Sequence, residues 1–191
     1  MHLKTFKNIA DMATKFIREG KVLVCPTDTV YGLICNATNK KAVEKLFKIK
    51  NRKPTNPIPI FVKDIKAAKK FAYIDKKQER FLKKVWPGKI TAVLNRKKGY
   101  KLYGLDKNTI GLRIPKYKLI IDLLKKINKP LTGTSANIIR KPASTEIKKV
   151  IKQFQNQKYQ PDLIIDAGNL PKSKPSKVID LTVHPPKILR H

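Results

Sequence analysis

Two short polar segments of this 191-residue chain hold the side chains that could do chemistry. Residues 26–33 place three hydroxyls and one carboxylate directly after the apolar run 22–25. Residues 48–54 hold Lys50 and Arg52 around a single asparagine, at the end of a helical pattern. Ligands of open α/β sheets bind in loops beyond strand ends, and two cations at this spacing can hold one anionic group. The two segments together predict a site for an anionic substrate.

Neither segment alone identifies a site, because threonine-rich loops are usually turns and a Lys-x-Arg pair in a lysine-rich chain is usually solvated surface. Together, and followed by Thr134-Ser135-Ala136-Asn137, they resemble the YrdC/TsaC family of threonylcarbamoyl-AMP synthases. The resemblance covers nearly the whole chain, through matches in the family's order at Thr27, Tyr31, Trp86-Pro87-Gly88, Thr91, Thr109, Arg113, Asp166-Ala167-Gly168, Ser176 and Arg190. The chain departs from the family pattern at Ile139-Arg140 and at Lys177, and the roles of Arg140 and Lys177 stay open.

The resemblance implies a nucleotidyltransferase that forms threonylcarbamoyl-AMP and pyrophosphate from L-threonine, bicarbonate and ATP. Its product would serve the N6-threonylcarbamoyladenosine modification of tRNA at position 37, through a partner complex that transfers the threonylcarbamoyl group. The catalytic residues implied are Lys50, Arg52, Ser135 and Asn137, and ATP binding adds Thr109 and Arg190 to these four. Threonine binding is implied for Thr27, Tyr31, Arg113 and Ser176. Mg²⁺ is expected to bridge the phosphates of ATP. The small number of aspartates and glutamates in the chain argues against a metal site built from protein ligands alone.

Apolar periodicity places these residues on an α/β fold. We predict helices over residues 8–19, 39–49, 64–71, 75–86, 117–127 and 147–154, and strands over 21–25, 57–62, 90–94, 109–114, 130–134, 163–165 and 178–181. The prolines within 57–62 predict an edge strand or a strand start. The second helix should end before Lys50 and Arg52 and leave both on an exposed turn. The expected architecture is a single domain, residues 1–191, with a YrdC-like twisted mixed sheet flanked by helices and a basic concave cleft.

The charge of the chain is high, with 44 basic and 13 acidic residues and a formal net charge of +31. Such a field attracts nucleic acid, but abundant lysine also arises from compositional drift in an AT-rich genome. An alternative function is therefore a module that binds double-stranded RNA or tRNA, or assists ribosome assembly, without turnover. A third is a carbamoyl-transfer domain of the hydrogenase-maturation kind, which shares the fold of the resembled family.

Cysteine and histidine offer little further chemistry. Cys25 and Cys35 lie among apolar residues and are predicted to be buried thiols, and the three histidines are too scattered for a zinc site. No glycine-rich phosphate loop is present, so a nucleotide must be held by cationic side chains and strand-end amides. No apolar stretch approaches the roughly 20 residues that cross a membrane, so we expect a cytoplasmic protein without membrane contact.

Overall fold

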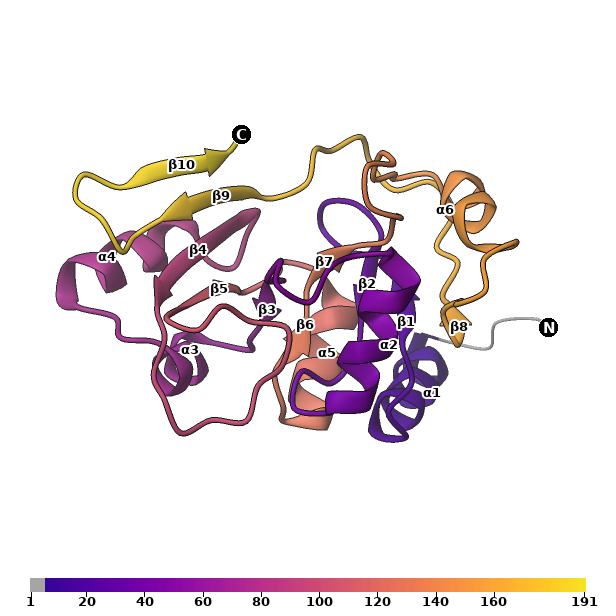
Figure 1. Cartoon of the computed structure of the whole chain (residues 1–191), viewed down its shortest axis with the longest axis horizontal. Coiled ribbons are helices and arrows are strands. Elements are labelled where there is room, and N and C mark those ends of the chain that lie inside the picture. The colour runs from indigo at the N-terminus through magenta and orange to yellow at the C-terminus, as the bar shows by residue number, and fades with distance from the viewer. Residues whose placement is uncertain (1–5) are drawn as a thin grey trace.

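The computed structural model describes residues 6–191, which form two mixed β-sheets and six helices (Figure 1). The first sheet has the order β7-β2-β1-β8, from β1 (Leu23–Cys25), β2 (Gly32–Ile34), β7 (Thr134–Ser135) and β8 (Leu163–Ile164). The second has the order β10-β9-β4-β5-β3-β6, from β3 (Ile60–Phe61), β4 (Ile90–Asn95), β5 (Thr109–Arg113), β6 (Leu131–Thr132), β9 (Lys177–Asp180) and β10 (Lys187–Arg190). The helices are α1 (Phe6–Arg18), α2 (Lys40–Lys50), α3 (Ile65–Phe71), α4 (Lys76–Val85), α5 (Lys118–Ile127) and α6 (Ile147–Phe154).

The α/β class with mixed strand pairing is confirmed, although the strands form two sheets where we predict one. Each sheet combines parallel and antiparallel neighbours: β1 is antiparallel to β2 and parallel to β8, and β4 is antiparallel to β5 and parallel to β9. The predicted domain also includes residues 1–5, which lie outside the described part of the chain.

Strand β1 lies between two hydrophobic cores because its side chains alternate between the faces of the sheet. Val22 and Val24 pack in the core that includes apolar residues of α2 and α6. Leu23 and Cys25 pack on the opposite face, in the core that includes α1 and α5. Helices on both faces explain the uninterrupted apolar run. Both cysteines are buried as predicted, and burial raises the pKa of the Cys25 thiol and raises that of Cys35 to about 12.

Helices cover one face of the second sheet, and polar side chains project from part of the opposite face. Ala92 and Leu112 pair across β4 and β5, and both pack in the core that includes residues of α3 and α4. Thr91 and Arg113 occupy the neighbouring positions of the same strands, so their side chains project from the opposite face. Figure 1 shows α3 and α4 at the end of the molecule that holds β4, with β9 and β10 running above them. This arrangement leaves the polar face of the sheet free to form a site.

The chain passes from one sheet to the other at Gly133, which separates β6 from β7. A Cβ atom at Gly133 would lie 2.4 Å from ring atoms of Phe61, so this close approach requires glycine. The amide N–H of Gly133 also donates to the carbonyl of Pro59, at 2.8 Å. The single strand predicted over 130–134 is therefore wrong, since two short strands in different sheets share that region.

Three further strand predictions need correction. Strand β3 lies between β5 and β6, so the edge-strand alternative is wrong and the strand-start alternative is right. Strand β2 follows within the segment that we predict as a loop, and β10 pairs with β9 where no strand is predicted. Both are short strands whose pairing is decided by distant partners.

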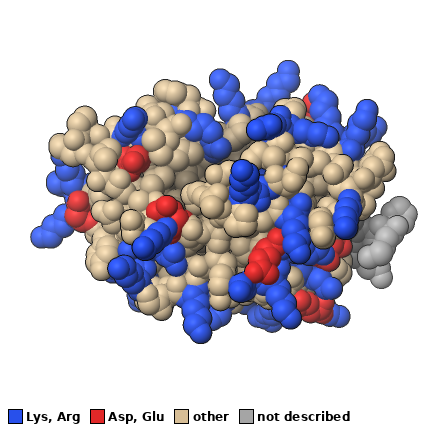
Figure 2. Space-filling model, viewed as in Figure 1, with Lys and Arg blue, Asp and Glu red and all other residues tan. Residues whose placement is uncertain are grey.

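Basic side chains are distributed over the whole visible face of the molecule, with few acids among them (Figure 2). The net charge of +31 therefore does not mark one surface by itself. Among the helices of residues 6–191, none combines the length and the apolar composition that crossing a membrane requires.

Candidate active site

A pocket of about 100 Å³ is lined by residues of both sheets, and we call it the arginine pocket. Six residues predicted for the site meet here: Thr27, Arg52, Arg113, Ser135, Ser176 and Arg190. The rest of the wall consists of Thr29, Val30, Gly32, Pro59, Phe61, Gly133, Thr134 and Pro175. Residues that are more than 160 positions apart in the sequence are thus brought to one cavity.

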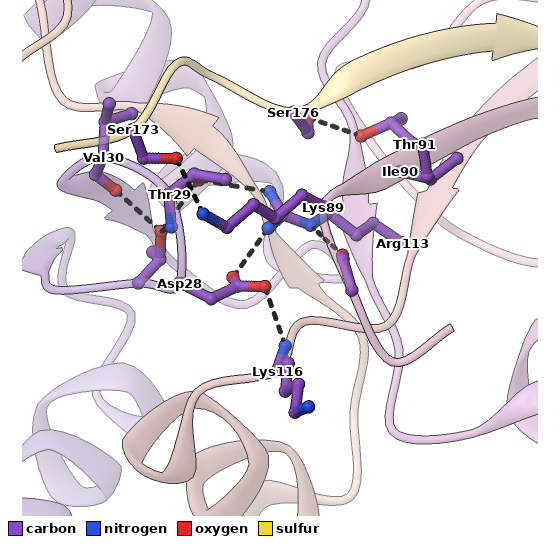
Figure 3. A network of polar contacts seen from close by, with 12 residues as sticks. Asp28, Thr29, Val30, Lys89, Ile90, Thr91, Arg113, Lys116, Ser173 and Ser176 are labelled. Carbon is purple, nitrogen blue, oxygen red and sulfur yellow. Dashed lines mark hydrogen bonds and ion pairs between the residues drawn. The ribbon is translucent and has the colours of Figure 1, made fainter. Parts of the chain in front are cut away.

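Arg113 is held by protein groups on several sides, and Figure 3 shows its contacts with Asp28 and Thr29. Its Nη2 donates to Oδ1 of Asp28 at 2.6 Å, and both side chains are almost completely buried. Its Nε donates to the carbonyl of Gly88 at 2.9 Å, and its Nη1 donates to Oγ1 of Thr29 at 3.3 Å. The other carboxylate oxygen of Asp28 accepts from the amide of Lys116 at 3.0 Å. A guanidinium has five N–H groups, so two remain available to a ligand.

Arg52 and Arg190 are also anchored by carbonyl groups. Arg190 donates from Nε and Nη2 to the carbonyl of Ser176, at 3.0 and 2.6 Å. Arg52 donates from Nε to the carbonyl of Asn56 at 3.0 Å and from Nη2 to that of Pro57 at 2.9 Å. Anchors of this kind orient the charged forks without neutralising them.

The pocket carries an excess of positive charge. Burial lowers the pKa of Arg52, and the nearby charge of Arg190 lowers it further. Burial also lowers the pKa of Arg113, while Asp28 raises it and Arg190 again lowers it. These shifts show that the guanidiniums repel one another, because a like charge disfavours the charged form of its neighbour. A bound anion would relieve this repulsion.

The hydroxyl groups of the pocket are held in fixed positions. The Thr27 hydroxyl donates to the carbonyl of Val30 at 2.7 Å and accepts from the amide of Thr29 at 3.0 Å. The hydroxyls of Ser176 and Thr91 are 2.9 Å apart. The Ser135 hydroxyl donates to Oδ1 of Asn137 at 2.6 Å. Both lone pairs of the Thr27 oxygen are engaged, by the amide and by the hydroxyl of Thr29, whereas the Ser135 oxygen can still accept from a ligand.

Lys50 corrects one of our predictions, because it does not lie on an exposed turn. It is the last residue of α2 and only 2% exposed, and Asn51 ends the helix in the left-handed conformation. Its Nζ donates to the carbonyls of Ser135 and Asn137 and to Oδ1 of Asn137, the last at 3.0 Å. An ammonium has three N–H groups, so all of them are engaged. Lys50 therefore holds the turn that carries Ser135 and Asn137, and neither Lys50 nor Asn137 lines the arginine pocket.

The environment of Lys50 also changes its acidity. Burial, and secondly the charge of Arg52, lower the pKa of Lys50 to about 7. The three oxygen acceptors are what keeps an ammonium in this buried position, because an unpaired buried charge is costly.

Two further predicted residues, Thr109 and Tyr31, do not line the pocket either. Thr109 lies at the opposite end of β5 from Arg113, about 13 Å away at the usual rise of a strand, and its hydroxyl donates to Asp106. Tyr31 is fully buried in the core, where its hydroxyl donates to the carbonyl of Gly168 at 2.7 Å and accepts from the amide of Ala167. The structure offers no ligand contact for either side chain.

A larger cavity, of about 910 Å³, shares Arg52 with the arginine pocket. Its wall also includes Lys48, Lys53, Tyr103 and Arg140, so Arg140 lies beside this cavity. Lys177 is in β9 and lines neither cavity.

No metal-binding cluster of three or more histidine, cysteine or acidic side chains occurs within residues 6–191. The carboxylate beside the pocket, Asp28, is already engaged by Arg113 and by the amide of Lys116. These residues therefore do not form a site for a resident metal ion.

Sequence reasoning noticed Asp28 and Thr29 in the polar loop but assigned neither of them a role, and it missed Phe61 and Gly133. The pairing of Asp28 with Arg113 spans 85 positions and leaves no local pattern. Gly133 had a detectable signal, because a glycine inside an apolar strand pattern marks a close backbone approach.

Comparison with known proteins places this geometry in context. The Sua5_yciO_yrdC family model, described as "Telomere recombination", matches residues 15–191. The threonylcarbamoyl-AMP synthase of Pyrococcus abyssi is 36% identical over 183 residues, which are 94% of this chain and 52% of that protein. The structure is similar to P. abyssi Sua5 complexed with L-threonine, with a TM-score of 0.87 and 33% identity over 98% of this chain and 55% of that one. It is also similar to Escherichia coli YciO, with a TM-score of 0.85 and 26% identity over 98% of this chain and 91% of that one. The chain thus spans about half the length of the P. abyssi proteins.

Proposed function

Because the chain belongs to the Sua5–YciO–YrdC family, we propose that it is an L-threonylcarbamoyladenylate synthase. This nucleotidyltransferase would form threonylcarbamoyl-AMP and pyrophosphate from L-threonine, bicarbonate and ATP. The observation that carries the proposal is the convergence of Arg52, Arg113 and Arg190 on one small pocket. All three substrates of the reaction are anionic or carry an anionic group, and this pocket has more positive than negative charge.

Threonine is proposed to bind in the arginine pocket, with its carboxylate against Arg113. The pocket volume of about 100 Å³ suits a small amino acid rather than a nucleotide. The two free N–H groups of Arg113 allow a paired contact with a carboxylate, which planar guanidinium favours. Thr27 and Ser176 lie in the same wall, where Thr27 bounds the threonine site and the Ser176 hydroxyl can pair with the amine or hydroxyl of the substrate.

The phosphates of ATP are proposed to bind at Arg52 and Arg190. Arg52 lies in the walls of both cavities, so the larger cavity offers room for the rest of the nucleotide beside the threonine site. The Ser135 hydroxyl lies in the same wall, on the turn that Lys50 holds. Mg²⁺ would enter with the triphosphate as part of the substrate.

The proposed reaction has two steps. The threonine amine attacks the carbon of bicarbonate, and loss of water leaves an N-carboxylate (carbamate). A carbamate oxygen then attacks the α-phosphorus of ATP, and the bond to the β-phosphate oxygen breaks to release pyrophosphate. Negative charge builds on the phosphoryl oxygens and the leaving group, so fixed cations stabilise the transition state most effectively. Arg52 and Arg190 supply these cations, and Lys50 acts by positioning the Ser135 turn.

The product is a mixed anhydride, a reactive acyl donor. We propose that it acts in the cytoplasm and passes its threonylcarbamoyl group to position 37 of tRNA through a separate transfer complex. The enzyme described here would then complete only the activation step.

The test is to incubate the protein with ATP, Mg²⁺, bicarbonate and L-threonine and to follow pyrophosphate, with mass spectrometry of the adenylate. Release that requires both threonine and bicarbonate is expected. Ser176→Ala, in the pocket, should raise the KM for threonine, whereas Ser173→Ala, a half-buried position of the same loop that does not line the pocket, should leave it unchanged. The proposal would be overturned if pyrophosphate release did not depend on threonine. It would also be overturned if folded protein released no pyrophosphate.

A further inference from the structure

A second concave surface lies away from the arginine pocket, and we call it the lysine groove. It has a volume of about 720 Å³ and is formed by α3, the loop after β4 and the C-terminal end of α5. Figure 1 shows that loop running beside α3. The wall contains five lysines, at positions 63, 66, 70, 101 and 129, together with Asp64, Phe71, Tyr100 and Asn128 among others. None of its residues lines either of the other two cavities.

The charge of the lysine groove is not neutralised by the protein. The carboxylate of Asp64 accepts from the amide of Ala67 at 2.6 Å and caps α3. Lys63 donates to the side-chain amide of Asn128 at 3.0 Å. Within residues 6–191, none of the five lysines takes part in an ion pair. The groove therefore presents several ammonium groups to an external anion.

Exposed aromatic rings accompany these lysines. Tyr100 is 43% exposed, and its ring packs edge-on against Phe71 with 5.1 Å between the centroids. Tyr73, two residues after α3 ends, is 62% exposed, and the Nζ of Lys97 lies 5.2 Å from its ring centroid. Large exposed rings that are held by their neighbours are ready to stack on a planar ligand.

We propose that the lysine groove binds single-stranded RNA, with phosphates on Lys66, Lys70, Lys101 and Lys129 and a base stacked on Tyr100. Several separate ammonium groups in the wall of one groove of about 720 Å³ suit a chain of phosphates rather than one phosphate. Proteins that bind single strands combine such a basic groove with aromatic stacking, which requires bases that are not paired in a duplex. The proposal does not depend on threonylcarbamoyl-AMP synthesis.

The first test measures the affinity of the full chain for a fluorescein-labelled single-stranded RNA 12-mer by anisotropy at several salt concentrations. Lys66 and Lys70 are exposed and one turn apart on α3, and Lys148 and Lys152 have the same relation on α6. Lys66→Ala with Lys70→Ala should weaken binding roughly tenfold and reduce the slope of log K against log salt by about 1.4. Lys148→Ala with Lys152→Ala should change neither quantity. Equal losses in the two double variants would overturn the proposal, because the binding would then reflect diffuse charge.

The second test addresses stacking. Tyr100→Leu keeps an apolar contact with Phe71 but removes the stacking face, and it should weaken RNA binding about fivefold to tenfold. Its affinity for inorganic polyphosphate should not change. Tyr159→Leu is the matched control, since Tyr159 is 38% exposed with Lys48 and Lys158 over its ring but lies outside the groove. Wild-type RNA affinity in Tyr100→Leu, or equal affinity of the wild type for duplex RNA, would overturn the proposal.

The enzymatic assay separates this inference from the proposed function. The Lys66/Lys70 double variant should release pyrophosphate at the wild-type rate, because neither residue lines the arginine pocket or the larger cavity that shares Arg52. If the wild type shows no threonine-dependent release, the synthase proposal fails while the RNA measurements still decide the role of the groove.

Discussion

Replacing Arg113 by lysine keeps the charge at the proposed threonine site and removes the planar fork. In the wild type the guanidinium contacts Asp28, Thr29 and the carbonyl of Gly88 and still has two N–H groups for a ligand. A lysine with its ammonium at Asp28 can satisfy one of these contacts well. We therefore expect Arg113→Lys to fold but to bind the threonine carboxylate poorly.

The size of the effect follows from the hydrogen bonds that are lost. A hydrogen bond to a charged group contributes about 1.5–3 kcal/mol, so replacing a paired contact by a single one should lower kcat/KM for threonine roughly 10-fold to 100-fold. The two lost contacts to Gly88 and Thr29 should lower the free energy of unfolding by about 2 kcal/mol. Because Arg113 is proposed to bind threonine and not ATP, the change should appear in the KM for threonine and leave that for ATP nearly unchanged.

The assay is threonine-dependent pyrophosphate release with each substrate varied in turn, and urea unfolding gives the stability. Arg96→Lys is the matched control, since Arg96 also donates to backbone carbonyls, those of Tyr100, Leu102 and Asp106, but lies outside the arginine pocket. The control should keep the wild-type KM for threonine. An unchanged KM for threonine in Arg113→Lys, with a raised KM for ATP, would refute the assignment.

Three shorter predictions concern the residues around the pocket. The free energy of unfolding of the wild type, measured with urea relative to that of Lys50→Met, should rise by roughly 2 kcal/mol from pH 7 to pH 9. The reason is that the pKa of Lys50 is about 7 in the folded protein and about 10.5 in the unfolded chain, so the unfolded chain binds more protons in this pH range. A difference that is independent of pH would contradict this prediction. Arg52→Ala should reduce turnover on the order of 100-fold in the pyrophosphate assay. Arg18→Ala is the control, because Arg18 does not line the pocket, and it should keep the wild-type rate. A wild-type rate in Arg52→Ala would remove Arg52 from the proposed phosphate site. Gly133→Ala should lower the unfolding free energy by about 1–3 kcal/mol, since its Cβ would meet the ring of Phe61 at 2.4 Å, and Phe61→Leu in that background should restore part of the loss.

Helices were the most predictable part of the fold, because their apolar periodicity is local. The predicted segments correspond to all six helices within residues 6–191, with differences of a few residues at their ends. Strands β2 and β10 were missed because a short strand is defined by its partners, and the register of β2 with β7 joins residues about 100 positions apart. The division into two sheets depends on Gly133 and Phe61, a contact that no local pattern contains.

The structure brings predicted site residues together where the family order named side chains at strand ends. Arg113 and Ser176 meet in the arginine pocket because β5 ends and β9 begins beside it. Thr109 shows the limit of this reasoning, since order along the chain does not say which end of a strand faces the site. Lys50 shows another limit, because its burial depends on the turn at Ser135, 85 positions away. The expectation that Lys50 and Arg52 both lie on an exposed turn is therefore wrong for Lys50.

Donor counting explains why arginine lines the pocket and lysine lies behind it. The three N–H groups of the Lys50 ammonium all donate to protein oxygens, so none is left for a substrate. Arg52, Arg113 and Arg190 also anchor themselves on protein oxygens, yet each of them keeps at least two N–H groups. A guanidinium can thus be fixed by the protein and bind an anion at the same time, whereas an ammonium in such surroundings does only the first. In a chain with so many lysines, the three arginines of one pocket therefore locate the chemistry better than the net charge does.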